Sequence, residues 1–335
     1  MLRRLALVSS IALAAGCGDD ASNPFTGLTA SQPPSADAVL LFVSGSWDPT
    51  PGKARELLAL NADGSKTERL TSCAQQGAPC DFVQVAPSPN RNRVAAIRTT
   101  PEAEAGASAL YFMDLSRSVE TMIFPNRRVA SVDYSPDGSF IVYSAPVGQT
   151  AAEDLFYSQP DGQQEQNLTE SAGFRERNPR VDPFARTVIF ERFDEAGVSR
   201  IYLYAETALT SGPAQGPPLP GTPYVVGADA DPVISPDGGS IAFRRLTGVG
   251  NGGLGTWDLL TLKADGLSTP EVLVTGALFR GAPDWGARGI VFVETDAARS
   301  RSELVLIQRD GTGRTVLRTE DAAFRMGAPR WLLGS

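Results

Sequence analysis

Short apolar runs separated by polar turns recur along the whole chain. The runs are rich in β-branched and aromatic residues and are bounded by Gly, Pro, Asp or Ser, a pattern typical of β-strands. One set of runs occupies residues 94–97, 141–143, 188–190, 241–243 and 290–293. A second set follows after polar loops, at residues 57–60, 110–113, 201–204 and 304–307. The pattern predicts an all-β protein.

The turn before each run of the first set belongs to a repeated phrase. It reads Val-Asp-Tyr-Ser-Pro-Asp-Gly from Val132 and Pro-Val-Ile-Ser-Pro-Asp-Gly from Pro232. A period of about 40 to 50 residues in a strand-rich chain predicts a β-propeller. The copies, aligned on the Ser of Ser-Pro-Asp-Gly, stand at Ser88, Ser135, Asp182, Ser235, Gly286 and Leu332, so the steps are 47, 47, 53, 51 and 46 residues.

The last copy contains only the first half of the phrase, because the chain ends at Ser335. An apolar strand that would complete it stands at the other end of the chain, at residues 39–42. We therefore expect the C-terminal strand to pair with the N-terminal strands. That pairing would close a ring of six four-stranded blades and leave no long open edge.

Two further features recur in several of the repeats. An Asp-Gly turn follows the second apolar run, where Gly supplies the positive φ of a tight hairpin. Its copies begin at Asp63, Asp161, Asp265 and Asp310, and Leu-Thr ends the last strand at Leu70 and Leu168. Together with the Ser-Pro-Asp-Gly phrase, these features resemble the TolB-type six-bladed propeller over residues 38–335. The resemblance implies a fold more than a function, because this blade also occurs in scaffold proteins and in the propeller half of prolyl oligopeptidase-type hydrolases.

The N-terminus is similar to a bacterial lipoprotein signal. Arg3 and Arg4 precede the apolar residues 5–15, and Ala14-Ala15-Gly16 leads into Cys17. The resemblance implies cleavage after residue 16 and a lipid on Cys17, whereas the alternative is an ordinary cleaved signal with a chance Cys. Residues 17–37 are polar and are predicted to be the lipidated Cys and a flexible tether. We expect a lipid-anchored protein of the bacterial envelope, and Gly18 at the position after Cys17 favours the outer membrane.

Two other cysteines, Cys73 and Cys80, lie in one predicted loop. In an oxidising envelope such a pair is expected to form a disulfide. A metal site is the alternative, but the chain contains no His to complete a tetrahedral shell.

The composition argues against catalysis and against nucleic acid. A chain without His has no Ser-His-Asp triad and no His general base, and no Gly-x-Ser-x-Gly motif is present. Catalysis by carboxylates, Tyr or Arg stays formally open. The formal net charge of −8 argues against nucleic acid and anionic lipid as main partners. We expect a non-enzymatic, monomeric propeller that binds another envelope protein.

The innermost strand of each repeat offers the candidate site. Residues one and three before each anchor are apolar or Pro and should pack between blades. Residues two and four before it should face the central channel, because side chains alternate along a strand. The first of these channel sets is Ala86, Asp133, Arg180, Val233, Asp284 and Arg330, and the second is Gln84, Ser131, Asn178, Asp231, Ala282 and Ala328.

The charged members of these sets are Asp133, Arg180, Asp231, Asp284 and Arg330, which we predict at the channel mouth. Two interpretations stay open: the charges pair across a wet channel and hold the blades in register, or they form a site for a ligand or peptide. Calcium on Asp133, Asp231 or Asp284 is opposed by the nearby arginines, so no cofactor is predicted. The main function predicted is a protein-binding scaffold or receptor. The alternative is recognition or processing of a small ligand or glycan at the channel mouth.

Overall fold

A computed structural model describes residues 28–46, 55–73, 81–99, 108–124, 127–148, 152–171, 173–184, 187–205, 228–249, 255–279, 282–295, 300–321 and 324–332. Every regular element within these ranges is a β-strand, and the prediction of an all-β chain is confirmed. The described residues accordingly include no helix with the length and apolar character needed to cross a membrane.

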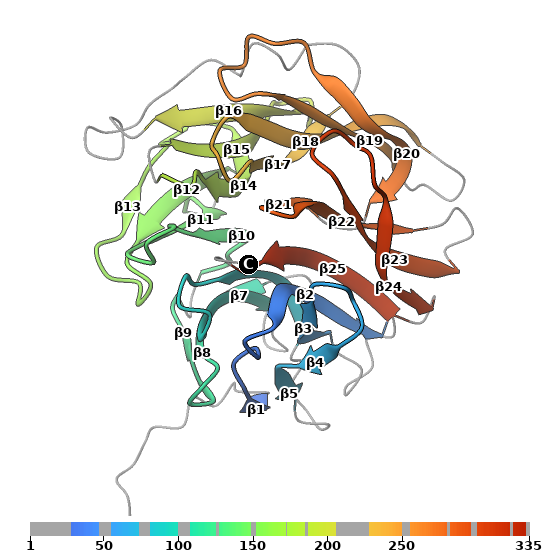
Figure 1. Ribbon diagram of the computed structural model, residues 1–335. Coiled ribbons are helices and arrows are strands. Elements are labelled where there is room, and N and C mark those ends of the chain that lie inside the picture. The colour runs from blue at the N-terminus through green and yellow to red at the C-terminus, as the bar shows by residue number, and fades with distance from the viewer. Residues whose placement is uncertain are drawn as a thin grey trace, which may run out of the picture.

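Antiparallel sheets are arranged around a central axis, and each runs outwards from an inner strand (Figure 1). The inner strands are β6 (Asp81–Pro87), β10 (Ser131–Tyr134), β14 (Arg175–Val181), β17 (Asp229–Ile234), β21 (Asp284–Gly286) and β25 (Phe324–Trp331). All but β25 end at the turn that carries the repeat anchor, so equivalent side chains meet near the axis.

The strands pair in sequence order within each repeat. From β6 the order is β7 (Arg93–Thr99), β8 (Ser108–Asp114) and β9 (Val119–Met122), and from β10 it is β11 (Ile141–Pro146), β12 (Glu153–Ser158) and β13 (Gln166–Asn167). From β14 it is β15 (Thr187–Phe193) and β16 (Ser199–Ala205). From β17 it is β18 (Ser240–Val249), β19 (Gly255–Lys263) and β20 (Glu271–Phe279), and from β21 it is β22 (Gly289–Thr295), β23 (Arg301–Ile307) and β24 (Thr315–Asp321).

The two ends of the chain share one sheet. β25 pairs antiparallel with β2 (Ala38–Ser46), with Leu40 opposite Trp331, and β2 continues to β3 (Glu56–Asn61) and β4 (Thr67–Arg69). The predicted pairing of the C-terminal strand with the N-terminal strands is therefore present.

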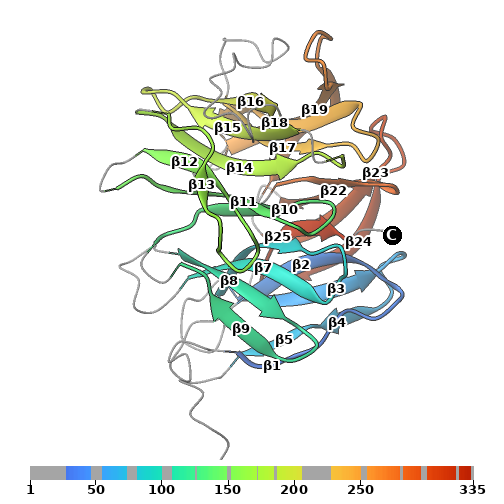
Figure 2. The same cartoon turned by 90° about the vertical axis from the view of Figure 1, so that its left-hand side faces the viewer.

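The predicted tether is wrong for residues 28–37. β1 (Leu28–Ser31) pairs with β5 (Thr71–Cys73) at the edge of the molecule, as both views show (Figure 2). The backbone N of Gln32 donates to the O of Leu70 at 2.9 Å, and the N of Ser31 donates to Oγ of Ser118 at 3.0 Å. An exposed edge such as that of β5 presents unpaired backbone groups, and β1 satisfies them. Leu28–Ser31 thus belongs to the folded part, ahead of the predicted boundary at residue 38.

Three predictions fall on residues that the structure does not describe. Residues 1–27 include the signal sequence and Cys17, and residues 74–80 include Cys80. The signal peptide, the lipid on Cys17 and the Cys73–Cys80 disulfide therefore stay predictions.

Apolar side chains of the inner and second strands fill the space between neighbouring sheets. Residues three before the anchors were predicted there, and they are buried: Val85, Val132, Pro179, Pro232, Pro283 and Pro329. The predicted hairpin glycines Gly64, Gly162, Gly266 and Gly311 all adopt positive φ, between 70° and 85°. Local turn chemistry and core packing thus agree with the repeat, and they fix the inner strands at the axis.

Candidate functional site

Four charged side chains from four inner strands meet at the axis and form what we call the ion-pair ring. Nη1 of Arg180 lies 3.1 Å from Oδ1 of Asp284, and Nη2 of Arg330 lies 3.0 Å from Oδ1 of Asp133. The other two pairs are looser, at 3.9 Å between Arg180 and Asp133 and 3.7 Å between Arg330 and Asp284. The structure thus brings together four of the five predicted site residues.

The ring is also bonded to the backbone of neighbouring strands. Oδ2 of Asp133 accepts a hydrogen bond from the N of Val181 at 2.9 Å, and Oδ2 of Asp284 accepts one from the N of Trp331 at 2.7 Å. Charge-assisted bonds of this kind are stronger than neutral ones. The guanidinium groups donate to backbone oxygens, at Pro283 for Arg180 and at Val85 and Val132 for Arg330. Each charge therefore ties its own strand to another repeat.

Burial dominates the electrostatics of the two carboxyl groups. Removal from water raises the pKa of Asp133 to about 6, although the charge of Arg180 opposes the rise. Burial likewise raises the pKa of Asp284 to about 6, and the negative charge of Asp133 adds to the effect while Arg180 opposes it. The ring therefore carries its full set of charges above about pH 6 and loses negative charge below it.

The ion-pair ring forms the floor of a cavity of about 600 Å³ on the side of the Ser-Pro-Asp-Gly turns. We call this cavity the funnel. Its wall is apolar and aromatic, and prolines of the turns line its mouth. The lining residues besides the ring include Pro87, Tyr134, Pro136, Val181, Pro183, Val233, Ile234, Pro236, Trp285 and Trp331.

The funnel wall corrects one prediction. Residues one before each anchor were expected to pack between blades, yet Pro87, Tyr134, Val181, Ile234, Trp285 and Trp331 all line the funnel. Some of them do both, since Tyr134 and Trp331 are only 7% exposed and belong to apolar clusters. A strand end in a twisted sheet turns its last side chain toward the axis, so strict alternation fails there.

A second cavity of about 170 Å³ lies on the opposite side of the ring, and we call it the back cavity. Arg180 and Arg330 separate it from the funnel, because they line both. Residues four before the anchors were predicted to face the channel, and five of them line this cavity: Gln84, Asn178, Asp231, Ala282 and Ala328. The prediction is wrong for Ser131 and Ala86. Both are fully buried and line neither cavity, and Ser131 Oγ instead bonds to Ser144 and the N of Asn178.

Asp231, the fifth predicted site residue, lies apart from the ring. Nδ2 of Asn178 donates to Oδ1 of Asp231 and to Oε1 of Glu191, both at 2.9 Å. Asp231 also pairs with Arg244, and its backbone N donates to Glu191. Among the described residues no group of three or more His, Cys, Asp or Glu side chains that could hold a metal ion occurs.

Glu191 is a residue that the sequence reasoning missed. It is 2% exposed, and burial together with the negative charge of Asp231 raises its pKa to about 8. The signal was a Glu directly after the apolar run 188–190, inside a predicted strand. A carboxyl at such a position requires a buried polar partner.

Local backbone geometry creates the back cavity. Asn178, Asp231 and Ala328 adopt positive φ of 51°, 50° and 46°. The strand register shifts at each of these positions. The shift lies between Arg177 and Arg180 in β14 and between Ala230 and Val233 in β17. In β25 it lies between Gly327 and Arg330, on either side of Ala328. A bulge re-aims one side chain without disturbing the rest of the strand. Three repeats use it at the same position.

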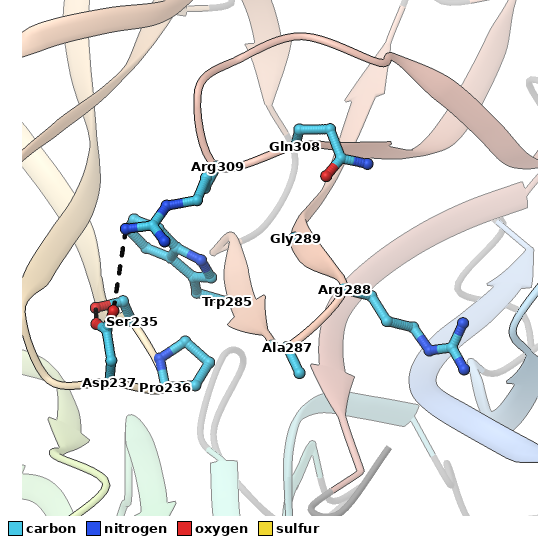
Figure 3. A pocket seen from close by; sticks show the side chains of 10 residues that line it. Ser235, Pro236, Asp237, Trp285, Ala287, Arg288, Gly289, Gln308 and Arg309 are labelled. Carbon is cyan, nitrogen blue, oxygen red and sulfur yellow. Dashed lines mark hydrogen bonds and ion pairs between the residues drawn. The ribbon is translucent and has the colours of Figure 1, made fainter.

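A third hollow, of about 180 Å³, opens beside the funnel, and we call it the rim pocket (Figure 3). Its lining comes from three turns, at residues 235–237, 285–289 and 308–309. Trp285 is half-buried and forms a wall of both the rim pocket and the funnel. Figure 3 shows Arg309 reaching past Trp285 toward Asp237, while Arg288 extends the opposite way.

Comparison with known proteins gives a consistent fold. No protein-family model and no curated protein sequence matches the chain. Among solved structures, TolB from Acinetobacter baumannii matches with a TM-score of 0.67 and 19% identity, over 90% of this chain and 68% of that one. A putative TolB from Agrobacterium tumefaciens matches with 0.60 and 16%, over 88% and 99%. The nidogen/laminin complex matches with 0.63 and 11%, over 89% and 99%. The chain therefore has a β-propeller fold of the kind found in TolB proteins.

Proposed function

We propose that this chain is a six-bladed propeller that binds another protein of the bacterial envelope in its funnel, without catalysis. The pairing of β25 with β2 supports a closed ring, since the sheet that both strands share would be the sixth blade. The lipid on Cys17 and placement at the outer membrane belong to the same proposal and rest on the signal-like N-terminus.

One observation carries the proposal: an open cavity of about 600 Å³ has an apolar, aromatic and proline wall over a floor whose charges are already paired. Interfaces are enriched in aromatic residues and depleted of unpaired charge at their centre. A protruding apolar segment of a partner would therefore enter the funnel without leaving a carboxylate or guanidinium unpaired.

The paired floor also bears on catalysis. Acid–base or metal-assisted chemistry needs carboxylates that are free to exchange protons or to hold a cation. Asp133 and Asp284 both contact Arg180 and Arg330. The arrangement supports a structural floor beneath a binding surface.

Recognition of a small ligand is the second candidate, because the funnel volume lies within the roughly 300–1,000 Å³ typical of small-molecule sites. The half-buried Trp285 would offer a stacking surface for a sugar ring or an aromatic group. The paired floor argues for recognition rather than processing of such a ligand.

The test blocks the funnel without removing any wall contact. Ala287 is exposed and lines the funnel, so Ala287→Trp would fill its mouth. Leu267→Trp is the matched control, because Leu267 is 78% exposed and lies outside the funnel. After equal melting temperatures are verified, both variants and the parent are crosslinked in native envelopes and purified. We expect one discrete protein to be captured by the parent and by Leu267→Trp, and lost from Ala287→Trp.

Other results would redirect the proposal. A partner that Ala287→Trp also captures would place the interface elsewhere on the molecule. Capture of no discrete protein by the parent would overturn protein binding and leave the small-ligand function as the better explanation.

A further inference from the structure

Two arginines stand where the repeat leads us to expect other residues, and both border the rim pocket. In the turn after β10, Ser135 Oγ donates to Oδ1 of Asp137 at 2.7 Å. In the turn after β17, Ser235 Oγ donates to Oδ1 of Asp237 at 2.6 Å. These Ser and Asp side chains hold their own turns together. The turn after β21 reads Gly-Ala-Arg-Gly, so Arg288 takes the place of that Asp.

The second departure lies in the neighbouring hairpin of the same repeat. The residue before Asp-Gly is small or Pro in the other repeats, namely Ala62, Pro160 and Ala264, whereas Arg309 occupies this position after β23. Arg309 is not needed to build its turn, because three other repeats make the Asp-Gly hairpin without it. The turn of Arg288 is shorter than its counterparts, since Gly286 pairs directly with Gly289.

Packing explains why Gly286 stands at the Ser position of the repeat, but it does not explain Arg288. A Cβ on Gly286 would lie 2.5 Å from Cγ of Trp331, so only Gly fits beneath the indole. Arg288 itself is exposed and makes no ion pair with any described residue. Arg309 has one loose ion pair, 4.0 Å from Asp237, and the two side chains are 72% and 62% exposed. Such a pair contributes little to stability.

The surroundings of these arginines indicate what they would bind. They flank Trp285 on opposite sides, and the rim pocket shares Pro236, Trp285, Gly286 and Ala287 with the funnel. With two arginines and one carboxylate, the described lining of the rim pocket is net positive on a chain of net charge −8. Arginine pairs well with carboxylates and stacks on flat groups.

From this arrangement we infer that the rim pocket binds an acidic segment of the partner protein, with Arg288 and Arg309 each pairing with a carboxylate beside an apolar residue that enters the funnel. The inference rests on the proposed protein-binding function and adds the chemistry of the partner. Asp237 is the one carboxylate among the described residues that line the pocket, and it competes for Arg309 together with the adjacent Asp310.

The probe is a random dodecapeptide library displayed on phage and selected on the folded, full-length protein. The test variant is Arg288→Gln with Arg309→Gln. The matched control is Arg69→Gln with Arg117→Gln, which removes two exposed charges outside the rim pocket whose ion pairs are loose, at 4.0 and 3.8 Å. All three proteins are shown to melt alike before selection, and the test variant and the control carry the same net charge.

On the parent and the control we expect selected peptides to combine an apolar residue with neighbouring Asp or Glu. On the test variant the apolar residue should remain while the acidic enrichment disappears. A synthetic peptide from the parent selection should bind the test variant about tenfold more weakly, as expected for two partly exposed ion pairs. Asp237→Asn should strengthen its binding two- to threefold, because Arg309 loses its competitor.

Three results would overturn the inference, and they are distinguishable. Apolar enrichment without acidic enrichment on the parent would reject the acidic partner. Acidic enrichment that survives on the test variant would reject Arg288 and Arg309 as its binding site, and either result leaves the proposed function standing. Absence of any apolar enrichment on the parent would reject both.

Discussion

The funnel and the back cavity lie on opposite sides of one ion-pair ring, yet the funnel lining is mainly apolar whereas the back-cavity lining is mixed. The funnel measures about 600 Å³ and is walled by Pro, Trp and aliphatic side chains. The back cavity measures about 170 Å³, and polar side chains make up half of its lining: Gln84, Asn178, Asp231 and three arginines, among small and apolar residues. The same repeated strand produces both, because its apolar end meets the funnel and its bulged polar beginning meets the back cavity. Binding capacity is thus expected on one side, and a fold-specific hydrogen-bond network on the other.

Arg330→Met is the change with the largest expected effect, since it opens the boundary between the two cavities. It removes a guanidinium that contacts both Asp133 and Asp284 and leaves two buried carboxyls facing one arginine. Breaking a buried pair costs roughly 3–5 kcal/mol, because the remaining charge is uncompensated. Urea unfolding measures the loss.

Arg69→Met is the control for this change. Arg69 is exposed and pairs with Glu56 only at 4.0 Å, so its loss should alter stability by less than about 0.5 kcal/mol. If the Arg330→Met variant were no less stable than the control, the ion pairs of Arg330 would contribute nothing to stability.

Glu191→Gln tests the hydrogen-bond network of Asp231 through the pH dependence of stability. The pKa of Glu191 is raised to about 8 from an ordinary 4.5, so the folded chain holds a proton that the unfolded chain releases. The contribution to stability is complete below about pH 4.5 and is lost as pH rises through about 8, with a total of roughly 3–5 kcal/mol. Gln keeps the acceptor for Asn178 and does not ionise.

The measurement is the difference in unfolding free energy between Glu191→Gln and the parent from pH 5 to pH 9. The variant should gain stability relative to the parent as pH rises. The ring contributes its own pH dependence through Asp133 and Asp284 nearer pH 6, but both proteins share it. A difference that stays constant with pH would mean that Glu191 is ionised in the folded chain.

The sequence predicted more of the ring than of the cavities around it. Asp133, Arg180, Asp284 and Arg330 occupy one position of a repeated strand, so periodicity alone placed them on one face. Glu191 could not be assigned a role, because its partner Asp231 is 40 residues away and is met only after a bulge. Trp285 and Trp331 were assigned to the packing between blades, since strand twist at the axis is not visible in a pattern of period two.

The strand β1 likewise could not be predicted from a local sequence pattern. Residues 28–37 lack a repeat motif, and their polar composition predicted a tether. Their strand exists because β5 offers an edge, which is a property of the assembled sheet. Long-range pairing was predictable only for β25 and β2, where two halves of one motif stood at opposite ends.

Gly286→Ala tests the funnel wall with a smaller expected effect. The added Cβ would meet the indole of Trp331 at 2.5 Å, so Trp331 must move within a packed cluster. Overpacking of this kind costs about 1–3 kcal/mol. Gly248→Ala is the control, because a Cβ there meets nothing within 4 Å. Thermal unfolding of both variants checks the difference, and equal melting temperatures would show that Trp331 is loosely held.

Ala328→Gly is the smallest change and probes the bulges of the back cavity. Ala328 has a φ of 46°, where a side chain is strained and Gly is not, so the variant should be more stable by about 0.5–1 kcal/mol. Ala282 is the equivalent residue of the preceding repeat, four positions before its anchor Gly286, and its φ is not positive. Ala282→Gly should therefore be destabilising by about 0.5–1 kcal/mol, because Gly only adds freedom to the unfolded chain. Chemical denaturation measures both changes in stability. A gain for Ala328→Gly with a loss for Ala282→Gly would locate strain in the bulge itself. Equal losses of stability for the two variants would show that the surrounding contacts hold Ala328 without strain.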